Sequence, residues 1–336
     1  MAKLRVGING FGRIGRVFFR SAFEQFDIVG INSLDSLEGN AHLLQYDSAH
    51  GTFAAEVSTK GDDILVVNGK ETHVTAIKNP AEIPWKKWGV DLVFECTGAF
   101  KNKEDFQKHI TAGAKRVIVS GPAEKGADLT VVWGINHESY DASKHHIVSN
   151  ASCTTNCLAP LAKVLNDAFG IENGTMMTIH SYTNDQKILD APHSDLRRAR
   201  AAAVSMIPTT TGAAKNVGLV LPDLKGKIDG ISVRVPTPNV SLVDFTFTAK
   251  KDMTKESVNE ALIAASKGAL KGILNVEHKE LVSCDFNGNK ASSIVDLQTT
   301  MTVGPRMAKV LSWYDNETGF SNRMIDVANY MVSKGL

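Results

Sequence analysis

Residues 6–15 read Val6-Gly7-Ile8-Asn9-Gly10-Phe11-Gly12-Arg13-Ile14-Gly15, and this stretch decides the fold. It joins an apolar run to a helix-like run, so the glycine spacing GxGxxG lies between a predicted strand and a predicted helix. That context is typical of a dinucleotide-binding loop. Gly10 permits the tight turn, Gly12 lets the backbone approach a pyrophosphate, and Gly15 lets the helix pack closely on the strand. A glycine-rich turn without a ligand is the structural alternative.

Strand-like and helix-like runs alternate through the first half of the chain. We predict strands over residues 4–9, 27–32, 64–67, 91–96 and 116–120, and helices over residues 16–25 and 101–112. The last two strands are short buried runs, which are typical of a parallel sheet covered on both faces. Ligands bind at the carboxyl ends of such strands, so Thr97, Gly98 and Ser120 are candidate cofactor contacts.

Position 33 bears on which dinucleotide would bind. In dinucleotide sites an acidic residue near the end of the second strand usually bonds the adenosine ribose. Here Ser33 takes that place, and the nearest acid is Asp35. A serine does not repel a 2′-phosphate as a carboxylate would. The residues themselves therefore leave NAD and NADP both open.

One cysteine, Cys153, has the surroundings of a nucleophile. It lies among small hydroxyl and amide residues and just before a helix predicted over residues 154–170. Free N–H groups and the dipole at a helix N-terminus favour the reactive thiolate. His180, with an ordinary pKa, is the predicted base. A cofactor loop together with an activated cysteine indicates aldehyde oxidation through a thioester, with the backbone N–H of Cys153 stabilising the oxyanion.

The second half of the chain has a different pattern. Alternating runs predict strands over residues 174–182, 227–235, 240–249 and 295–303, which suits an antiparallel sheet with one packed face. Helices are predicted over residues 253–271 and 321–333, and the long polar segment 183–205 is typical of a functional or interfacial loop.

These patterns predict an α/β protein with two domains. We expect a Rossmann dinucleotide-binding domain over residues 1–151, completed by a C-terminal helix from about 317 to 336. An α+β catalytic domain with a mostly antiparallel sheet is expected over residues 152–316.

Three groups of residues are candidates for binding anions. Residues 209–212 open a helix-like segment, so the hydroxyl of Thr211 and the free N–H groups near Gly212 converge there. Ser152 and Thr154 flank the nucleophile. Two arginines, Arg198 and Arg234, offer forked donors that match a phosphate. An ordinary structural salt bridge is an equally weighted alternative for each arginine.

Composition excludes several classes of protein. The chain has 336 residues and a formal net charge of +1, which suggests neither nucleic-acid nor membrane binding. It contains no run of about 20 apolar residues. Four scattered cysteines indicate reduced thiols in a cytoplasm, and their spacing predicts no metal site.

The motifs resemble those of phosphorylating glyceraldehyde-3-phosphate dehydrogenases over essentially the whole chain. The matching blocks are the loop at 6–16, the active-site run at 151–160, and the runs at 211–215, 233–238 and 313–317. The resemblance implies that Cys153 is the nucleophile and His180 the base in oxidising glyceraldehyde 3-phosphate to 1,3-bisphosphoglycerate, in glycolysis or gluconeogenesis. It also implies a homotetramer, in which segment 183–205 reaches a neighbour's cofactor.

Binding residues follow from the same resemblance. The substrate phosphate would contact Thr183, Asp185 and Arg234. Inorganic phosphate would contact Ser152, Thr154, Arg198, Thr211 and Gly212. The dinucleotide would contact Arg13, Ile14, Lys78, Ser120 and Asn316, of which Asn316 would hold the nicotinamide carboxamide.

Some positions depart from the family's pattern. Ser33 stands where NAD-dependent members usually carry Asp, and Lys78 stands where Arg is common. Thr318 and Phe320 replace a usual Trp and Tyr. We hypothesise that the enzyme accepts NADP as well as NAD. Pro192 argues the other way, because members that prefer NADP often carry a small polar residue there.

Three alternative functions compete with this interpretation. Erythrose-4-phosphate dehydrogenase uses the same thiol chemistry but would favour water over phosphate, and the intact phosphate set argues weakly against it. An enzyme of the aspartate-semialdehyde dehydrogenase type shares a Rossmann domain and a cysteine, but not these motif blocks. A non-enzymatic dinucleotide sensor or nucleic-acid binder is disfavoured because the net charge is near neutral and both Cys153 and His180 are present.

Overall fold

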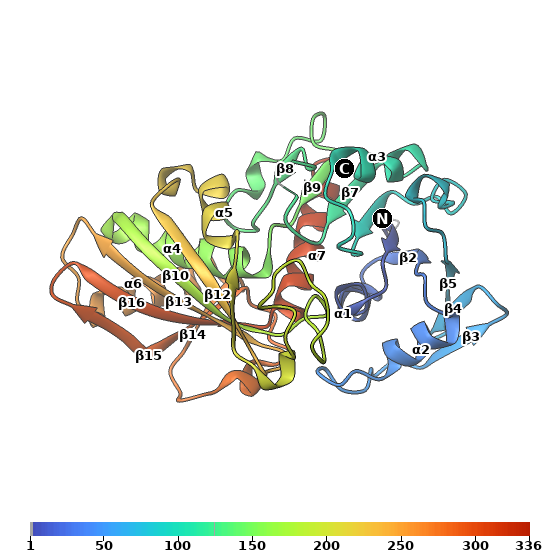
Figure 1. Ribbon diagram of the computed structural model, residues 1–336. Coiled ribbons are helices and arrows are strands. Elements are labelled where there is room, and N and C mark those ends of the chain that lie inside the picture. Colours follow the sequence, from blue (N-terminus) through green and yellow to red (C-terminus); the bar gives the residue numbers. More distant parts are fainter. Residues whose placement is uncertain (1–2, 124) are drawn as a thin grey trace. The chain divides into compact units, whose positions relative to one another are not determined.

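The chain forms two compact units, each with its own β-sheet (Figure 1). The computed structural model describes residues 3–123 and 125–336, so residues 1, 2 and 124 of the first predicted domain lie outside the described residues. One unit runs to Val131 and adds His137–Ala151 and Ser321–Leu336. The other contains Val132–Asn136 and Ser152–Phe320.

The sheet of the first unit has nine strands among the described residues, in the order β3-β4-β5-β2-β1-β6-β7-β9-β8. From β5 to β8 the neighbouring strands are parallel, whereas β3 and β4 form an antiparallel edge. The chain leaves β1 towards β2 on one side and later returns to pair β6 on the other side. Such a change of direction is where open α/β sheets bind ligands.

The first unit contains these elements: β1 (Arg5–Asn9), α1 (Arg13–Ala22), β2 (Asp27–Asn32), α2 (Leu37–Gln45), β3 (Val57–Lys60), β4 (Ile64–Val67), β5 (Lys70–Thr75), β6 (Leu92–Glu95), α3 (Lys103–Thr111), β7 (Arg116–Val119), β8 (Leu129–Thr130) and β9 (Ile147–Ser149). Helix α7 (Thr318–Ser333) begins in the second unit and ends in the first.

The second unit contains these elements: α4 (Cys153–Phe169), β10 (Ile171–Ser181), β11 (Ile207–Thr210), α5 (Ala213–Val220), β12 (Ile228–Val235), β13 (Ser241–Ala249), α6 (Lys255–Lys267), β14 (Leu274–Glu277), β15 (Ser293–Val303) and β16 (Met307–Tyr314).

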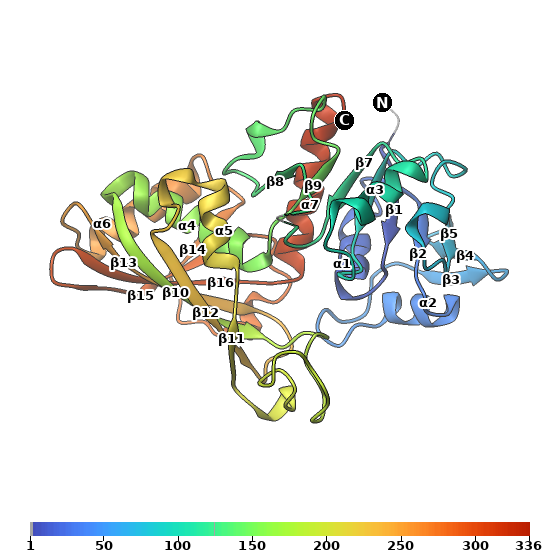
Figure 2. The same cartoon turned by 45° about the horizontal axis from the view of Figure 1, so that its top comes forward.

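The sheet of the second unit has the order β11-β12-β10-β13-β16-β15-β14 among the described residues. Its pairings are antiparallel except β10 with β12 and β14 with β15. Helices α4, α5 and α6 pack against one another or the sheet and lie over one of its faces (Figure 2). The predicted α/β class, with a Rossmann domain and a mostly antiparallel second sheet, is confirmed.

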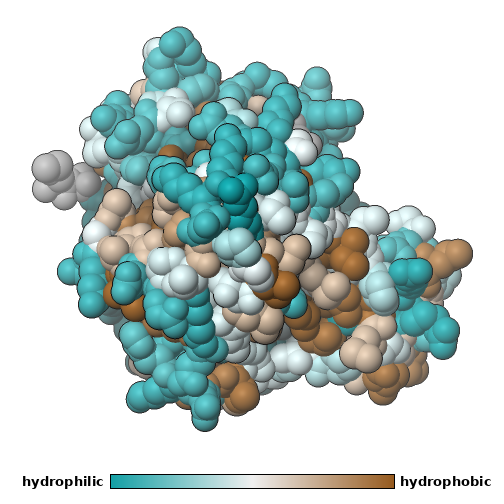
Figure 3. All heavy atoms as spheres, turned by 90° about the vertical axis from the view of Figure 1, so that its left-hand side faces the viewer, coloured by the Kyte–Doolittle hydropathy of each residue, from teal (hydrophilic) through white to brown (hydrophobic). Residues whose placement is uncertain are grey.

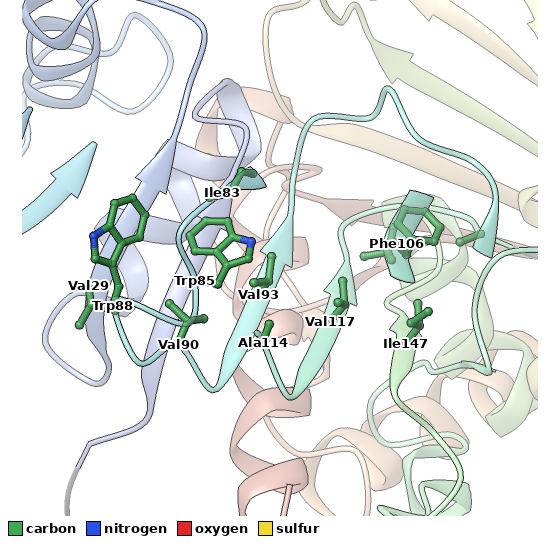
Figure 4. Packing of buried hydrophobic residues seen from close by; sticks show 12 residues of the cluster. Val29, Ile83, Trp85, Trp88, Val90, Val93, Phe106, Ala114, Val117 and Ile147 are labelled. Carbon is green, nitrogen blue, oxygen red and sulfur yellow. The ribbon is translucent and has the colours of Figure 1, made fainter. Parts of the chain in front are cut away.

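Two tryptophans fill the core of the first unit against two glycines. Trp85 and Trp88 belong to a buried cluster with Val93 and its neighbours (Figure 4). Gly7 of β1 and Gly30 of β2 are register partners. A Cβ atom on Gly7 would lie 2.6 Å from the Trp85 ring, and one on Gly30 would lie 2.3 Å from the Trp88 ring. Gly7 is therefore needed for packing against Trp85.

Element bounds differ from the sequence prediction mainly around the glycine loop. Helix α1 spans Arg13–Ala22, so the predicted range 16–25 was wrong at both ends. The helix starts directly after Gly12, which acts as its N-cap without any side-chain hydrogen bond. Helix α2 and strands β3, β5, β8, β9, β11, β14 and β16 carried no predicted element, although β16 alternates buried and less buried positions.

Among residues 3–123 and 125–336, no helix combines the length and apolar character needed to cross a bilayer.

Replacing Gly7 by alanine tests this packing. The added methyl group collides with the buried Trp85 ring, so we expect Gly7→Ala to lower the free energy of unfolding by about 2 kcal/mol. The measurement is urea unfolding followed by tryptophan fluorescence. Gly121→Ala is the matched control, because a Cβ atom there meets nothing within 4 Å. Equal unfolding midpoints for the two variants would contradict the packing argument.

Candidate active site

Cys153 is the first residue of helix α4. Ser152 caps this helix, and its hydroxyl accepts a hydrogen bond from the backbone N–H of Thr155. Just before the cap, the buried residue Ala151 has φ +55°, a conformation that costs energy for a residue with a Cβ atom. This turn directs the chain from β9 into α4, so that the thiol lies at the helix N-terminus.

The structure brings His180 next to Cys153. His180 lies on β10, and its Nε2 is 3.5 Å from the Sγ of Cys153. Its Nδ1 is 2.7 Å from the backbone oxygen of Ser181, which can only accept. The closer contact, to Ser181, favours the ring hydrogen on Nδ1 over acceptance from Nη1 of Arg234 at 3.1 Å, and the Nε2 lone pair then faces the thiol. This tautomer is the one that a base for Cys153 requires.

Arg234 lies on the other side of the His180 ring. Strands β10 and β12 are parallel, and His180 is the register partner of Arg234. The Nη1 of Arg234 is 3.1 Å from Nδ1 of His180 and donates to the backbone oxygen of Ser181 at 3.1 Å. It also reaches the hydroxyl of Thr183 at 3.5 Å. The Nε of Arg234 is buried and has no hydrogen-bond partner among the described residues.

Protonation of the Cys153–His180 pair differs from the sequence prediction. Burial, followed by the charge of Arg234, lowers the pKa of His180 to about 3, so the expectation of an ordinary pKa was wrong. Burial raises the pKa of Cys153, although Arg234 and hydrogen bonds from Thr154 oppose the rise. Desolvation thus outweighs the helix terminus, and the resting pair is a thiol beside a neutral imidazole.

Arg198 is held by several groups at once. It donates from Nε to the hydroxyl of Thr209 at 2.9 Å and from Nη2 to the backbone oxygen of Thr210 at 3.3 Å, and its Nη1 pairs with Asp185. Thr209 in turn donates to Asp195 at 2.6 Å. The structural salt bridge considered for Arg198 is therefore present, and it fixes the guanidinium in place.

Arg234 differs from Arg198 because no carboxylate pairs with it within 4.0 Å among the described residues. The charge of Arg198 is nevertheless felt at Arg234, since burial and then Arg198 lower the pKa of Arg234. Two guanidinium groups that destabilise one another favour an anion between them.

The other predicted phosphate contacts, Thr154, Thr211 and Gly212, differ in burial and in hydrogen bonding. Thr154 is buried, and its hydroxyl forms a hydrogen bond of 2.8 Å with the hydroxyl of Tyr314. The hydroxyl of Thr211 accepts from the backbone N–H of Ala213 at 3.1 Å. Gly212 is exposed and caps helix α5. These positions put hydroxyl and N–H groups at two helix N-termini, which are suited to anions.

Sequence reasoning missed Tyr314. Its hydroxyl contacts Thr154 and Thr178 at 2.8 Å each, and its ring meets the His180 ring edge-on with centroids 6.0 Å apart. Tyr314 is the last residue of β16. Residues 307–314 alternate between buried and less buried positions, as expected for a strand, but no strand was predicted there.

A cavity of about 350 Å³ lies at the carboxyl ends of strands in the first unit. Five of the predicted cofactor contacts line it: Gly10, Gly12, Ser33, Lys78 and Thr97. Five others do not line it: Arg13, Ile14, Gly15, Gly98 and Ser120. Asn316 lies in the second unit, where its Oδ1 accepts from the hydroxyl of Ser241 at 2.9 Å. Asn9 and Asn32 also line the cavity, and sequence reasoning missed both.

The glycine loop fits a dinucleotide. A Cβ atom on Gly10 would lie 2.6 Å from the backbone nitrogen of Thr97, and one on Gly15 would lie 2.2 Å from the oxygen of Gly10. Gly12 has open space around it, so a phosphate can approach its backbone. Arg13 forms an ion pair with the buried Asp47, whose pKa falls to about 2 because hydrogen bonds and the charge of Arg13 outweigh burial.

Ser33 takes part in local hydrogen bonds at the end of β2. Its hydroxyl donates to Asn40 at 3.1 Å and accepts from the backbone N–H of Asp35 at 3.4 Å. Asp35 is exposed, and Lys78 lines the same cavity. The neutral Ser33 hydroxyl imposes no repulsion on a 2′-phosphate, whereas the carboxylate of Asp35 also lines the cavity.

Comparisons with known proteins place both units in one family. The model described as "Glyceraldehyde 3-phosphate dehydrogenase, NAD binding domain" matches residues 4–103, and the one described as "Glyceraldehyde 3-phosphate dehydrogenase, C-terminal domain" matches residues 152–316. The chain is 59% identical over 334 residues to "Glyceraldehyde-3-phosphate dehydrogenase 1" of Bacillus cereus. It is 58% identical over 335 residues to "Glyceraldehyde-3-phosphate dehydrogenase" of Geobacillus stearothermophilus. Both alignments cover 99% of each chain, and they confirm the resemblance.

Alkylation of Cys153 tests the electrostatic role of Arg234. Removing the guanidinium removes a charge that stabilises the thiolate, so the pKa of Cys153 rises further in Arg234→Leu. The thiolate fraction at any pH below that pKa then falls. We expect the pH midpoint of iodoacetamide alkylation to move upward, as measured by mass spectrometry of the peptide that contains Cys153. Arg306→Leu, which removes an exposed partner of Asp252, is the control. An unchanged or lower midpoint in Arg234→Leu contradicts the assignment.

Proposed function

The chain belongs to the glyceraldehyde-3-phosphate dehydrogenase family, and we propose that it oxidises and phosphorylates glyceraldehyde 3-phosphate to 1,3-bisphosphoglycerate in glycolysis or gluconeogenesis. The observation that carries the proposal is the 3.5 Å contact between the Sγ of Cys153 and the Nε2 of His180, in the tautomer suited to a base. NAD, when bound, supplies the acceptor for the hydride.

Cys153 starts the reaction as the nucleophile. Its Sγ bonds to the aldehyde carbon while its proton passes to Nε2 of His180, and the carbonyl oxygen becomes an oxyanion. The backbone N–H of Cys153, at the first position of α4, would stabilise this oxyanion. The low pKa of His180 does not prevent the transfer, because the negative oxyanion forms beside the imidazolium as the proton arrives.

Cys153 then holds the acyl group as a thioester. The aldehyde hydrogen leaves the carbon with both bonding electrons, and the oxyanion collapses to the thioester carbonyl. A phosphate oxygen adds to that carbonyl and expels the sulfur, which recovers its proton from His180. The phosphate's own proton goes to solvent, so one proton is released in each turnover.

We assign the anion contacts to two arginines and the hydroxyls near them. Arg234, with Thr183, would bind the phosphate of the substrate. Asp185 acts through its pairing with Arg198, because a carboxylate does not itself bind a phosphate. Arg198 would then bind inorganic phosphate with the group Ser152, Thr154, Thr211 and Gly212.

Erythrose-4-phosphate dehydrogenase was the enzymatic alternative. The names of the relatives do not favour it, since those reported above are glyceraldehyde-3-phosphate dehydrogenases. A strict dependence of the rate on phosphate separates the two activities, because the alternative would transfer the acyl group to water.

We propose a homotetramer in the cytoplasm. Large apolar side chains are exposed on the molecular surface (Figure 3). Segment 183–205 carries several of them, including Ile188 at 86%, Leu196 at 82% and Val204 at 80% exposure. Exposed apolar patches mark protein–protein contacts, which supports assembly through this segment. Sedimentation equilibrium gives the mass of the assembly directly.

Initial rates with glyceraldehyde 3-phosphate and NAD test the proposed activity. We expect the rate to depend on inorganic phosphate, to vanish in Cys153→Ser, and to fall by about 10² to 10⁴ in His180→Gln because the base is lost. Cys284→Ser, which removes an exposed thiol, is the matched control and should retain the rate. If the unsubstituted protein reduces no dinucleotide under these conditions, the proposed activity is wrong.

Substitution of Ser33 tests the cofactor preference. We propose that the enzyme uses NADP as well as NAD, because the Ser33 hydroxyl carries no charge to repel a 2′-phosphate. In Ser33→Asp the new carboxylate should lower kcat/KM for NADP by at least about tenfold relative to NAD. Ser36→Asp, three residues away at the exposed cap of α2, is the control. An advantage of about a thousandfold for NAD in the unsubstituted enzyme rejects the idea.

A further inference from the structure

A buried carboxylate, Glu95, lies at the end of β6, beside the cavity of the first unit. Its side chain is 2% exposed, and its neighbour His109 is fully buried. Neither residue has a part in the thiol chemistry, and neither lines the cavity. A charge buried this deeply is costly unless hydrogen bonds satisfy it, so the partners of Glu95 are informative.

The direction of one hydrogen bond fixes the protonation of His109. The indole Nε1 of Trp85, which can only donate, lies 3.0 Å from Nδ1 of His109. Nδ1 therefore accepts, and the ring hydrogen is on Nε2. An imidazolium would have hydrogens on both nitrogens and would face the indole N–H with a second donor. His109 is thus neutral, and its Nε2 donates to Oε2 of Glu95 at 2.9 Å.

Three more donors point at Glu95. The Nδ2 of Asn9 donates to Oε2 at 2.6 Å. The backbone N–H of Thr97 donates to Oε1 at 2.8 Å, and the Thr97 hydroxyl donates to the same oxygen. Both carboxylate oxygens therefore accept from two donors each. Four neutral donors, with no cation in hydrogen-bond contact among the described residues, hold Glu95 as an anion.

This anion sets the direction of hydrogen bonds across neighbouring strands. Because Nδ2 of Asn9 points at Glu95, its Oδ1 is left to accept from Nδ2 of Asn32 at 2.8 Å. The Oδ1 of Asn32 then accepts from the backbone N–H of Ile77 at 2.8 Å and from the hydroxyl of Thr75 at 3.0 Å. One carboxylate thereby orders the ends of β1, β2, β5 and β6.

Four members of this network reach the cavity: Asn9, Asn32, Ile77 and Thr97 line it together with the glycine loop. We propose that Glu95 is a positioning residue for the dinucleotide, which acts through Asn9 and Thr97 by fixing the polarity and placement of the groups that line its pocket. This inference rests on the proposed function only in taking the ligand of the cavity to be a dinucleotide.

Glu95→Gln tests the inference with almost no change of shape. The amide nitrogen of glutamine must face donors, so at least one hydrogen bond to Asn9, Thr97 or His109 is lost. We expect the Kd for NAD, and equally that for ADP-ribose, to rise about tenfold by isothermal titration calorimetry on the full-length protein. The weaker binding should raise the KM for NAD and leave kcat unchanged. Unchanged affinity for both ligands, or a loss confined to kcat, overturns the proposal.

Two substitutions of His109 form a matched pair that leaves the carboxylate in place. His109→Gln keeps an acceptor for Trp85 and a neutral donor for Glu95, so the Kd for NAD should match that of the unsubstituted protein. His109→Phe keeps the ring volume but removes the donor, so the Kd should rise. If both variants lose the same affinity for NAD, the positive charge of His109 is what Glu95 requires. His109 would then be a cation, and the assigned tautomer would be wrong. Equal, unchanged binding in both would overturn the role of the network.

These outcomes are separable from the proposed enzyme activity. Binding is measured without substrate, and the unsubstituted protein is assayed in parallel for phosphate-dependent reduction of NAD. Binding of NAD without turnover contradicts the proposed reaction alone. Normal turnover with unaltered affinity in Glu95→Gln and His109→Phe contradicts the positioning role alone. Thermal unfolding of each variant identifies any that fails to fold, and in that case the remaining variant of the set decides.

Discussion

The parallel pairing of β10 with β12 is the constraint on which the candidate active site depends. This register makes His180 the partner of Arg234, on the face of the sheet that receives the start of α4. Side chains alternate along a strand, so a slip of one residue would turn His180 away from Cys153 and towards the opposite face. Thr178, two residues earlier on the same face, contacts Tyr314. Catalytic geometry and strand register are therefore a single property of this sheet.

Burial has opposite consequences in the two units. Around Cys153, loss of water favours the neutral thiol and the neutral imidazole, so reactivity depends on the charge that the substrate brings and develops. Around Glu95, the charge is retained because four neutral donors replace water. The neutral pair of Cys153 and His180 allows a proton to move from one side chain to the other. The charged Glu95 fixes the orientation of the amides that donate to it. In each of the two places, fixed protein dipoles take over from water.

The sequence was most informative where function depends on local spacing. The glycine loop predicted the strand and a helix after it, though not the bounds of that helix, and the flanks of Cys153 predicted the start of α4. Contacts that depend on strand register could not be predicted from the sequence. His180 and Arg234 are 54 residues apart and meet only because two strands pair in parallel. The directions of the pKa shifts were also beyond reach, because they follow from burial that arises only in the folded chain.

The central claim is that Cys153 carries the substrate as a thioester. Mass spectrometry of the intact protein and of its peptides, after mixing the enzyme with glyceraldehyde 3-phosphate and NAD without inorganic phosphate, tests it most directly. The account predicts that one 3-phosphoglyceroyl group accumulates on the Cys153 peptide and disappears when phosphate is added. NAD reduction that proceeds with no acyl group on Cys153 would contradict the account.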